Sequence, residues 1–154
     1  MAIDRLVSLD LGVVPEAAVS GGLLLQTESS VYFLFNAMRV EPDGRRVEAG
    51  TAALRFEASL QSRFGYPDDS ARRGHSVLAR SDVGYGIYEV MNSSWLADVQ
   101  RQYKVGFAGM RHFVVTLHDS TFECLARAVS LDVRSDGYEA AFQRIAAKAM
   151  QDPR

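Results

Sequence analysis

Residues 111–128, RHFVVTLHDSTFECLARA, contain the side chains best suited to chemistry. They include two of the three histidines and the only cysteine, together with acidic and hydroxyl groups. An imidazole can act as an acid or a base near neutral pH, and thiolates and imidazoles can serve as nucleophiles or metal ligands. The spacing of apolar residues predicts a β-hairpin that turns at residues 118–121, with Asp119 and Ser120 at its tip.

The predicted hairpin has one apolar side and one polar side. In the favoured register Leu117 faces Phe122 and Phe113 faces Ala126, because a slip of one residue would mix the two sets. The apolar side carries Phe113, Val115, Leu117, Phe122, Cys124, Ala126 and Ala128. The other side carries His112, Thr116, His118, Thr121, Glu123 and Arg127, with Val114 and Leu125 among them.

Spacing argues against a metal site shared by His112 and His118. Six residues of extended strand separate them by roughly 20 Å, whereas ligands lie about 2 Å from a metal ion. A site would need one of them together with Asp119, Glu123 or the distant His75. Since no cofactor fingerprint appears either, we predict neither a metal nor any other cofactor.

The cysteine is predicted to be a core residue. The hairpin places Cys124 among Phe113 and Val115, on the side opposite His118, so that no imidazole is within reach to form a thiolate pair. Free cysteine is often buried as a small hydrophobic residue.

An acid–base cluster is the main catalytic hypothesis. Glu123 is expected diagonally across the hairpin from His118, where a carboxylate would orient the imidazole and tune it for proton transfer. Asp119 is the other candidate orienting group, and His75 would come from the aperiodic segment 65–76, which has the length and composition of a covering or binding loop. The alternative is that these groups form the solvated side of an antiparallel sheet.

Four further residues are candidates for ligand binding. Tyr85 and Trp95 could line an aromatic pocket, although such residues are more often part of a core. Glu89 lies on a strand rich in apolar residues and would need an arginine or histidine partner. Arg127 belongs to the polar side of the hairpin. Ser93 is interpreted as a helix cap, because no G-x-S-x-G motif surrounds it.

The elements that must position these residues are mostly strands. Residues 31–40 are apolar on both sides through Phe35, which predicts a central strand covered on both faces. Residues 47–64 alternate between apolar and polar like a strand, although many of them are helix formers. We favour a strand because a hairpin turn, EPDGR, precedes them. A helix remains the alternative for 51–64. The other predicted strands are 3–14, 23–27, 77–80, 85–91 and a second hairpin strand that runs from 121 to 133. Helices are predicted at 95–103 and from Tyr138 onward, the second opened by an Asp136-to-Glu139 capping box.

Composition predicts one soluble globular domain, residues 1–154. The chain is 47% hydrophobic and 23% charged, and its net charge of −2 gives no basic surface for nucleic acid or an anionic membrane. It lacks a signal peptide pattern and any apolar run long enough to span a bilayer, and it has a single cysteine. We therefore expect a location in the cytoplasm.

The predicted fold class is α+β and β-rich. We expect a mostly antiparallel sheet of about seven strands, curved or closed into a barrel-like roll, with one internal helix and a C-terminal helix. The expected function is non-catalytic binding of a small ligand or a protein, with self-association as a homodimer. The alternative is a small hydrolase- or isomerase-like enzyme that uses His118, Asp119, Glu123 and His75.

Overall fold

The computed structural model describes residues 3–16, 21–80, 83–104 and 108–152. Its strands are β1 (Arg5–Ser8), β2 (Val13–Pro15), β3 (Leu23–Gln26), β4 (Val31–Val40), β5 (Arg46–Glu57), β6 (Gln61–Gly65), β7 (Gly86–Met91), β8 (Arg111–Thr116), β9 (Thr121–Ala126) and β10 (Ala128–Arg134). The helices are α1 (Ser94–Tyr103) and α2 (Tyr138–Gln151), with short 3-10 turns η1 (Arg72–Gly74) and η2 (Leu78–Arg80).

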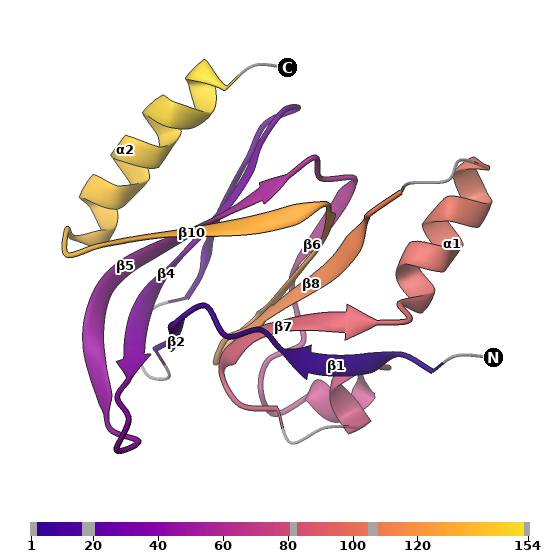
Figure 1. The fold of residues 1–154 in the computed structure, drawn as a ribbon, viewed down its shortest axis with the longest axis horizontal. Coiled ribbons are helices and arrows are strands. Elements are labelled where there is room, and N and C mark those ends of the chain that lie inside the picture. Colours follow the sequence, from indigo (N-terminus) through magenta and orange to yellow (C-terminus); the bar gives the residue numbers. More distant parts are fainter. Residues whose placement is uncertain (1–2, 17–20, 81–82, 105–107, 153–154) are drawn as a thin grey trace.

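The strands form two antiparallel sheets rather than one closed barrel. The first has the order β1-β7-β8-β9-β6, and the second has the order β10-β5-β4-β2, with β3 also paired to β4. Figure 1 shows α2 beside the second sheet and α1 beyond the ends of β7 and β8, on the other side of the molecule. The prediction of a β-rich α+β fold is confirmed. The strands form two sheets, which do not close into a barrel, instead of the single curved sheet that the sequence predicts.

Aromatic side chains fill the space between the sheets. Phe33 of β4 stacks on Phe122 of β9 with ring centroids 4.4 Å apart, and Phe56 of β5 lies 5.7 Å from Phe113 of β8. Burying such large apolar surfaces is the main stabilising contribution to a fold of this kind. The apolar side of the predicted hairpin, Cys124 included, belongs to this core.

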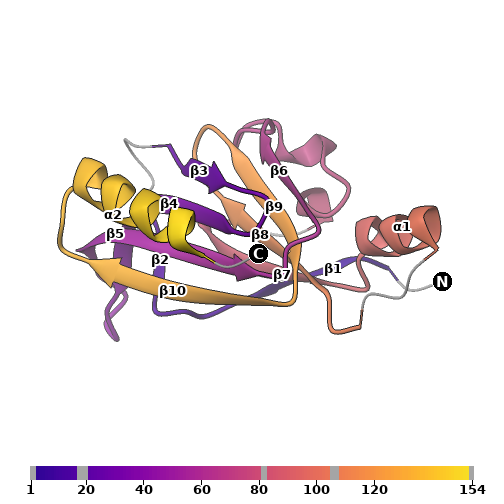
Figure 2. The same cartoon turned by 90° about the horizontal axis from the view of Figure 1, so that it is seen from above.

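Helix α2 covers the outer face of the second sheet, as both views of the molecule show (Figure 2). Ala141, Ile145 and Ala149 pack on Tyr32 and Leu34 of β4. Strand β4 is therefore covered on both faces, as its sequence predicts. The predicted capping box is wrong: the N-cap is Gly137, which supplies no side-chain bond, and Asp136 instead pairs with Arg144.

Three predicted strands are each interrupted where the chain passes from one sheet to the other. Segment 3–14 divides into β1 and β2 before and after Gly12, whose φ is 86°. Segment 47–64 is a strand rather than a helix, but it breaks after Glu57, where Ala58 adopts a φ of 52°. Segment 121–133 breaks at Arg127. Each segment therefore changes sheet at a corner, where the strand is interrupted.

Two other local predictions are also corrected. Residues 77–80 contain the 3-10 turn η2 instead of a strand. The hairpin of β8 and β9 has a register two residues from the predicted one: Phe113 is opposite Cys124 and Thr116 is opposite Thr121, around a four-residue connection. A shift of two residues leaves every side chain on its predicted face but changes its neighbours.

Gly50 is predicted to be essential for the bend in β5. It has a φ of 105° opposite an irregularity in the pairing of β4 and β5, and an added Cβ would collide with the backbone carbonyl of Arg134. Gly50→Ala should lower the free energy of unfolding by about 3 kcal/mol, from backbone strain and overpacking together.

Gly44→Ala is the matched control for that measurement. Gly44 has a φ of 85° with open space around its Cα, so only the backbone cost of about 1 kcal/mol applies. Equal losses for the two variants in urea denaturation would show that the contact with β10 has no effect.

Candidate functional site

The outer face of the first sheet carries a buried polar network between two apolar clusters. On one side Val77, Leu78 and Val83 pack against Val90 and Val114 of the sheet. On the other side the α1 residues Trp95, Leu96 and Val99 pack on Leu125, together with Leu60. The polar groups between these clusters are therefore shielded from water, and each buried polar atom requires a partner.

Arg72 fastens the loop that covers this face. Its guanidinium, in a residue only 8% exposed, donates to the carbonyl oxygens of Leu117 at 2.7 Å and Val83 at 3.0 Å. The backbone N–H of Asp69 also donates to the carbonyl of His118 at 3.0 Å. These bonds hold the loop that carries His75 against the sheet.

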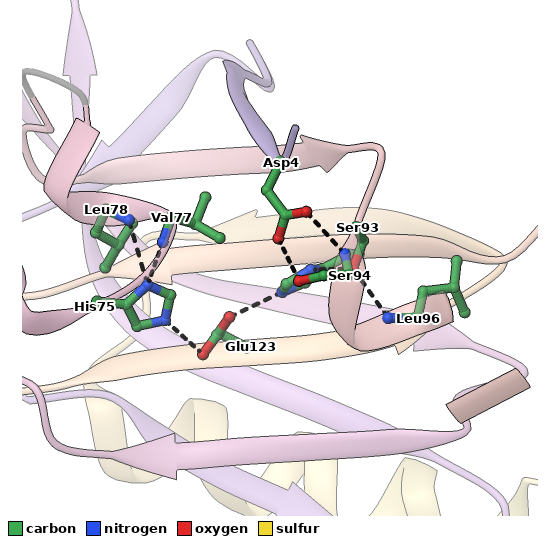
Figure 3. A network of polar contacts seen from close by, with 9 residues as sticks. Asp4, His75, Val77, Leu78, Ser93, Ser94, Leu96 and Glu123 are labelled. Atoms are coloured by element: carbon green, nitrogen blue, oxygen red, sulfur yellow. Dashed lines mark hydrogen bonds and ion pairs between the residues drawn. The ribbon is translucent and has the colours of Figure 1, made fainter. Parts of the chain in front are cut away.

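Glu123 of β9 lies at the centre of the network (Figure 3). Its Oε1 is 2.8 Å from Nε2 of His112, its Oε2 is 3.1 Å from Nε2 of His75, and the residue is 6% exposed. Burial raises the pKa of this carboxyl, but the hydrogen bonds from the two imidazoles outweigh burial and lower the pKa to about 2. The carboxylate is therefore ionised at neutral pH and only accepts hydrogen bonds.

Hydrogen-bond directions along the network follow from these partners. Nδ1 of His75 accepts from the backbone N–H groups of Val77 at 3.1 Å and Leu78 at 3.2 Å, so the proton of the neutral ring lies on Nε2 and points to Glu123. His112 likewise donates through Nε2 to the carboxylate. Its Nδ1, in the neutral ring, must then accept a hydrogen bond.

Ser93 supplies that hydrogen bond. Its Oγ lies 2.8 Å from Nδ1 of His112 and accepts from the backbone N–H of Leu96 at 3.0 Å, as the N-cap of α1. The preceding residue, Asn92, has a left-handed φ of 58°, which turns the chain sharply from β7 into α1. The hydroxyl proton of Ser93 is thereby directed at His112, and the order Ser93, His112, Glu123 forms a single relay.

Contacts of His112 and of Ser94, the residue after Ser93, support this relay. The ring of Trp95 meets the imidazole of His112 edge-on, with centroids 5.1 Å apart. The carboxylate of Asp4 accepts from the backbone N–H of Ser94 at 2.9 Å and from its hydroxyl at 2.8 Å. The chain before β1 is thus attached to the first turn of α1 (Figure 3).

An open pocket of about 730 Å³ adjoins the serine end of the relay. It lies between one side of α1 and the ends of β7 and β8, and this is a typical size for a small-molecule site. Its apolar lining residues are Val90, Met91, Leu96, Ala97 and Met110. Its polar lining residues are Glu89, Asn92, Ser93, Ser94, Asp98, Gln100, Arg101, Arg111 and His112.

The structure divides the predicted acid–base residues between two places. Glu123 and His75 are in contact, as the hypothesis requires. His118 is 54% exposed and instead contacts Asp69, at 2.7 Å between Nδ1 and Oδ2, while Asp119 is 83% exposed and 3.7 Å from the imidazole. The expected approach of Glu123 to His118 is wrong, because the two-residue change in register places Glu123 beside His112.

Tyr85 belongs to the cluster around His118. Its hydroxyl donates to Oδ2 of Asp69 at 2.6 Å and lies 3.1 Å from Nδ1 of His118. The hydrogen bond from Tyr85 is the main cause that lowers the pKa of Asp69, and the same bond raises the pKa of the tyrosine. This cluster joins the covering loop to the sheet.

The other predicted ligand-binding residues have different positions. Glu89 lines the pocket and has the predicted arginine partner: two hydrogen bonds, of 2.6 and 3.0 Å, link it to Arg111. Trp95 is buried under the guanidinium of Arg63, at 3.8 Å from the ring centroid. Arg127 is exposed at the corner between β9 and β10.

The cysteine is buried in the core, as predicted. Cys124 is fully buried among aromatic and aliphatic groups, and burial raises the pKa of its thiol to about 12. A thiol with such a pKa is not a thiolate nucleophile at neutral pH.

The contact between Ser93 and His112 does not follow from the sequence. Its role as a helix cap is a sufficient explanation of Ser93, and the alternation of the hairpin predicts a solvated side for His112, which is only 2% exposed in the structure. The one available signal was the strand–turn–helix order around Asn92 and Ser93, which resembles the setting of an exposed nucleophile even without its glycines.

No protein-family model, curated protein or solved structure matches this chain significantly. Among the residues that the structure describes, no cluster of three or more histidine, cysteine, aspartate or glutamate side chains has a geometry suited to a metal ion. The described helices include none with the length and apolar character needed to cross a bilayer.

Replacing the central carboxylate should destabilise the protein in a pH-dependent way. Because the pKa of Glu123 falls from 4.5 to about 2 on folding, its contribution is present above pH 4.5 and is lost as the pH falls toward 2. Glu123→Gln should therefore cost about 3 kcal/mol of unfolding free energy near neutral pH and much less in strong acid.

The measurement is urea denaturation of both proteins at about pH 7 and about pH 3. Glu139→Gln, which changes an exposed carboxylate in the first turn of α2, is the control and should shift stability by less than about 0.5 kcal/mol. A difference between wild type and Glu123→Gln that does not change with pH would contradict the assigned charge state.

Proposed function

We propose that the protein binds a small neutral organic molecule in the pocket between α1 and the ends of β7 and β8. The observation that carries this proposal is that Ser93 and His112, at one end of the buried polar network, line an open pocket of about 730 Å³. Pockets that combine apolar walls with a few fixed polar groups are the usual form of small-ligand sites.

The lining favours a ligand with an apolar body. Met91 lines the pocket from the end of β7, Met110 lines it from the residue before β8, and Leu96 and Ala97 line it from α1. Methionine side chains are flexible and polarisable, so they adapt to ligands of different shape.

The charges around the pocket favour a ligand without net charge. Glu89 is paired with Arg111, and Asp98 is paired with Arg101. Each charged group already has an opposite partner, so a charged ligand would have to disrupt a pair or be bound unpaired. The remaining polar groups suit a carbonyl or hydroxyl head group near Ser93.

Binding should be visible at the methionine methyl groups. Two of the five methionines, Met91 and Met110, line the pocket, whereas Met38 and Met150 lie elsewhere. In a titration of methyl-labelled protein with 2-decanone, the signals of Met91 and Met110 should shift and those of Met38 and Met150 should not. Decanoate, which carries a charge on the same chain, should bind several-fold more weakly.

A filled pocket provides the control. Ala97→Trp adds a bulky group to an exposed helix position that lines the pocket, and it should abolish the shifts. Ala147→Trp places the same group on an exposed position of α2 and should have no effect. Equal binding by the two variants would exclude this pocket as the site.

Self-association is the second candidate, and we propose it through the edge strand β1. Val7 is exposed on that strand and Ile3 is exposed just before it, and an open strand edge can pair with a second copy. Sedimentation should then show a homodimer that Val7→Glu dissociates, and a monomer at all concentrations would contradict it.

We propose the cytoplasm as the location, consistent with a single, buried cysteine.

A further inference from the structure

We propose that Ser93 is a nucleophile and that the protein hydrolyses neutral carboxylic esters in this pocket. The proposal goes beyond binding and rests on it, because an ester must enter the pocket before it can react. It depends on the relay of Ser93, His112 and Glu123, whose three groups are joined by two contacts of 2.8 Å.

The relay has the three roles that activate a serine. The imidazole of His112 accepts the serine proton, the buried carboxylate of Glu123 fixes the ring and stabilises it when it becomes charged, and Ser93 lies at the pocket. Here the nitrogens exchange the positions that they have in chymotrypsin-like triads: Nδ1 faces the serine and Nε2 faces the carboxylate. The roles of donor and acceptor are unchanged by that exchange.

His75 acts as a positioning residue. It donates to the second oxygen of Glu123 and is itself fixed by two backbone N–H groups, those of Val77 and Leu78. The carboxylate is therefore held through both oxygens, and Oε1 cannot rotate away from His112. A fixed orienting group reduces the reorganisation needed when the imidazole gains a proton.

The reaction is balanced without a cofactor. Oγ of Ser93 attacks the ester carbonyl carbon while its proton passes to Nδ1 of His112; the bond to the alcohol oxygen then breaks, and the alcohol leaves with that proton. Water attacks the acyl-serine next and gives a proton to His112, and the acid is released as Ser93 recovers its proton. Acid and alcohol are the only products.

Donors for the developing oxyanion are present at the start of α1. The N–H and the hydroxyl of Ser94 both donate to the half-buried carboxylate of Asp4, so this pair of donors already binds negatively charged oxygen. In the reaction the ester oxyanion would take the place of the Asp4 carboxylate and accept these two hydrogen bonds. Hydrogen bonds to the oxyanion are among the larger contributions to the rate of acyl transfer.

The alternative is that Ser93 is only a helix cap. A cap and a nucleophile differ in reactivity rather than in position, so chemical labelling distinguishes them. A fluorophosphonate forms a bond from phosphorus to an activated serine oxygen with loss of fluoride, whereas a hydroxyl that serves only as a cap does not react.

The experiment combines labelling with hydrolysis of p-nitrophenyl octanoate. Wild type should be labelled at Ser93, as located by mass spectrometry of peptides, and should release p-nitrophenol from the ester. Ser93→Gly, which keeps a residue tolerated at caps, should lose labelling and reduce the rate by at least about a hundredfold. Gly44→Ala, which lies far from the pocket, controls for a modest loss of stability and should retain both.

The outcomes separate this inference from the proposed binding function. If 2-decanone shifts Met91 and Met110 but wild type is not labelled, the nucleophile is excluded and the binding site remains. Labelling at a different serine, or equal rates for wild type and Ser93→Gly, would also overturn the proposal. If the ketone does not bind and no label is incorporated, both proposals fail.

Discussion

The ionised carboxylate of Glu123, held between two imidazoles on the outer face of the first sheet, is the constraint on which the site depends. An isolated charge in such a place would be strongly destabilising, so the sheet, the covering loop and α1 must each supply a compensating group. The loop supplies His75, β8 supplies His112, and the turn into α1 supplies Ser93. Glu123 contacts the two imidazoles directly, and Ser93 is joined to it through His112.

Much of the fold was predictable because its signals are local. The apolar run of β4, the EPDGR turn and the polar residues 92–94 at the start of α1 each specify a structure within a few residues. The corners could not be predicted in the same way. Ala58 and Arg127 do not resemble turn residues, and only the need to complete two facing sheets breaks the strands there.

The site was less predictable than the fold because it depends on register and on covering segments. The alternation of the hairpin assigned each residue to the correct face, but a change of two residues in pairing exchanged His118 for His112 as the neighbour of Glu123. That face was expected to be solvated, since the sequence gives no indication that the loop carrying His75 folds over it. Once the loop buries this face, its polar side chains must form hydrogen bonds with one another instead of with water.

The passage of the chain between the two sheets at three corners affects how the protein can fold. Strand β1 pairs with β7, so that Arg5 lies opposite Met91, while β2 immediately after it belongs to the other sheet. Each sheet thus combines strands from distant parts of the chain. Such non-local pairing is characteristic of slow folding, in milliseconds to seconds, and the two sheets should melt together rather than one after the other.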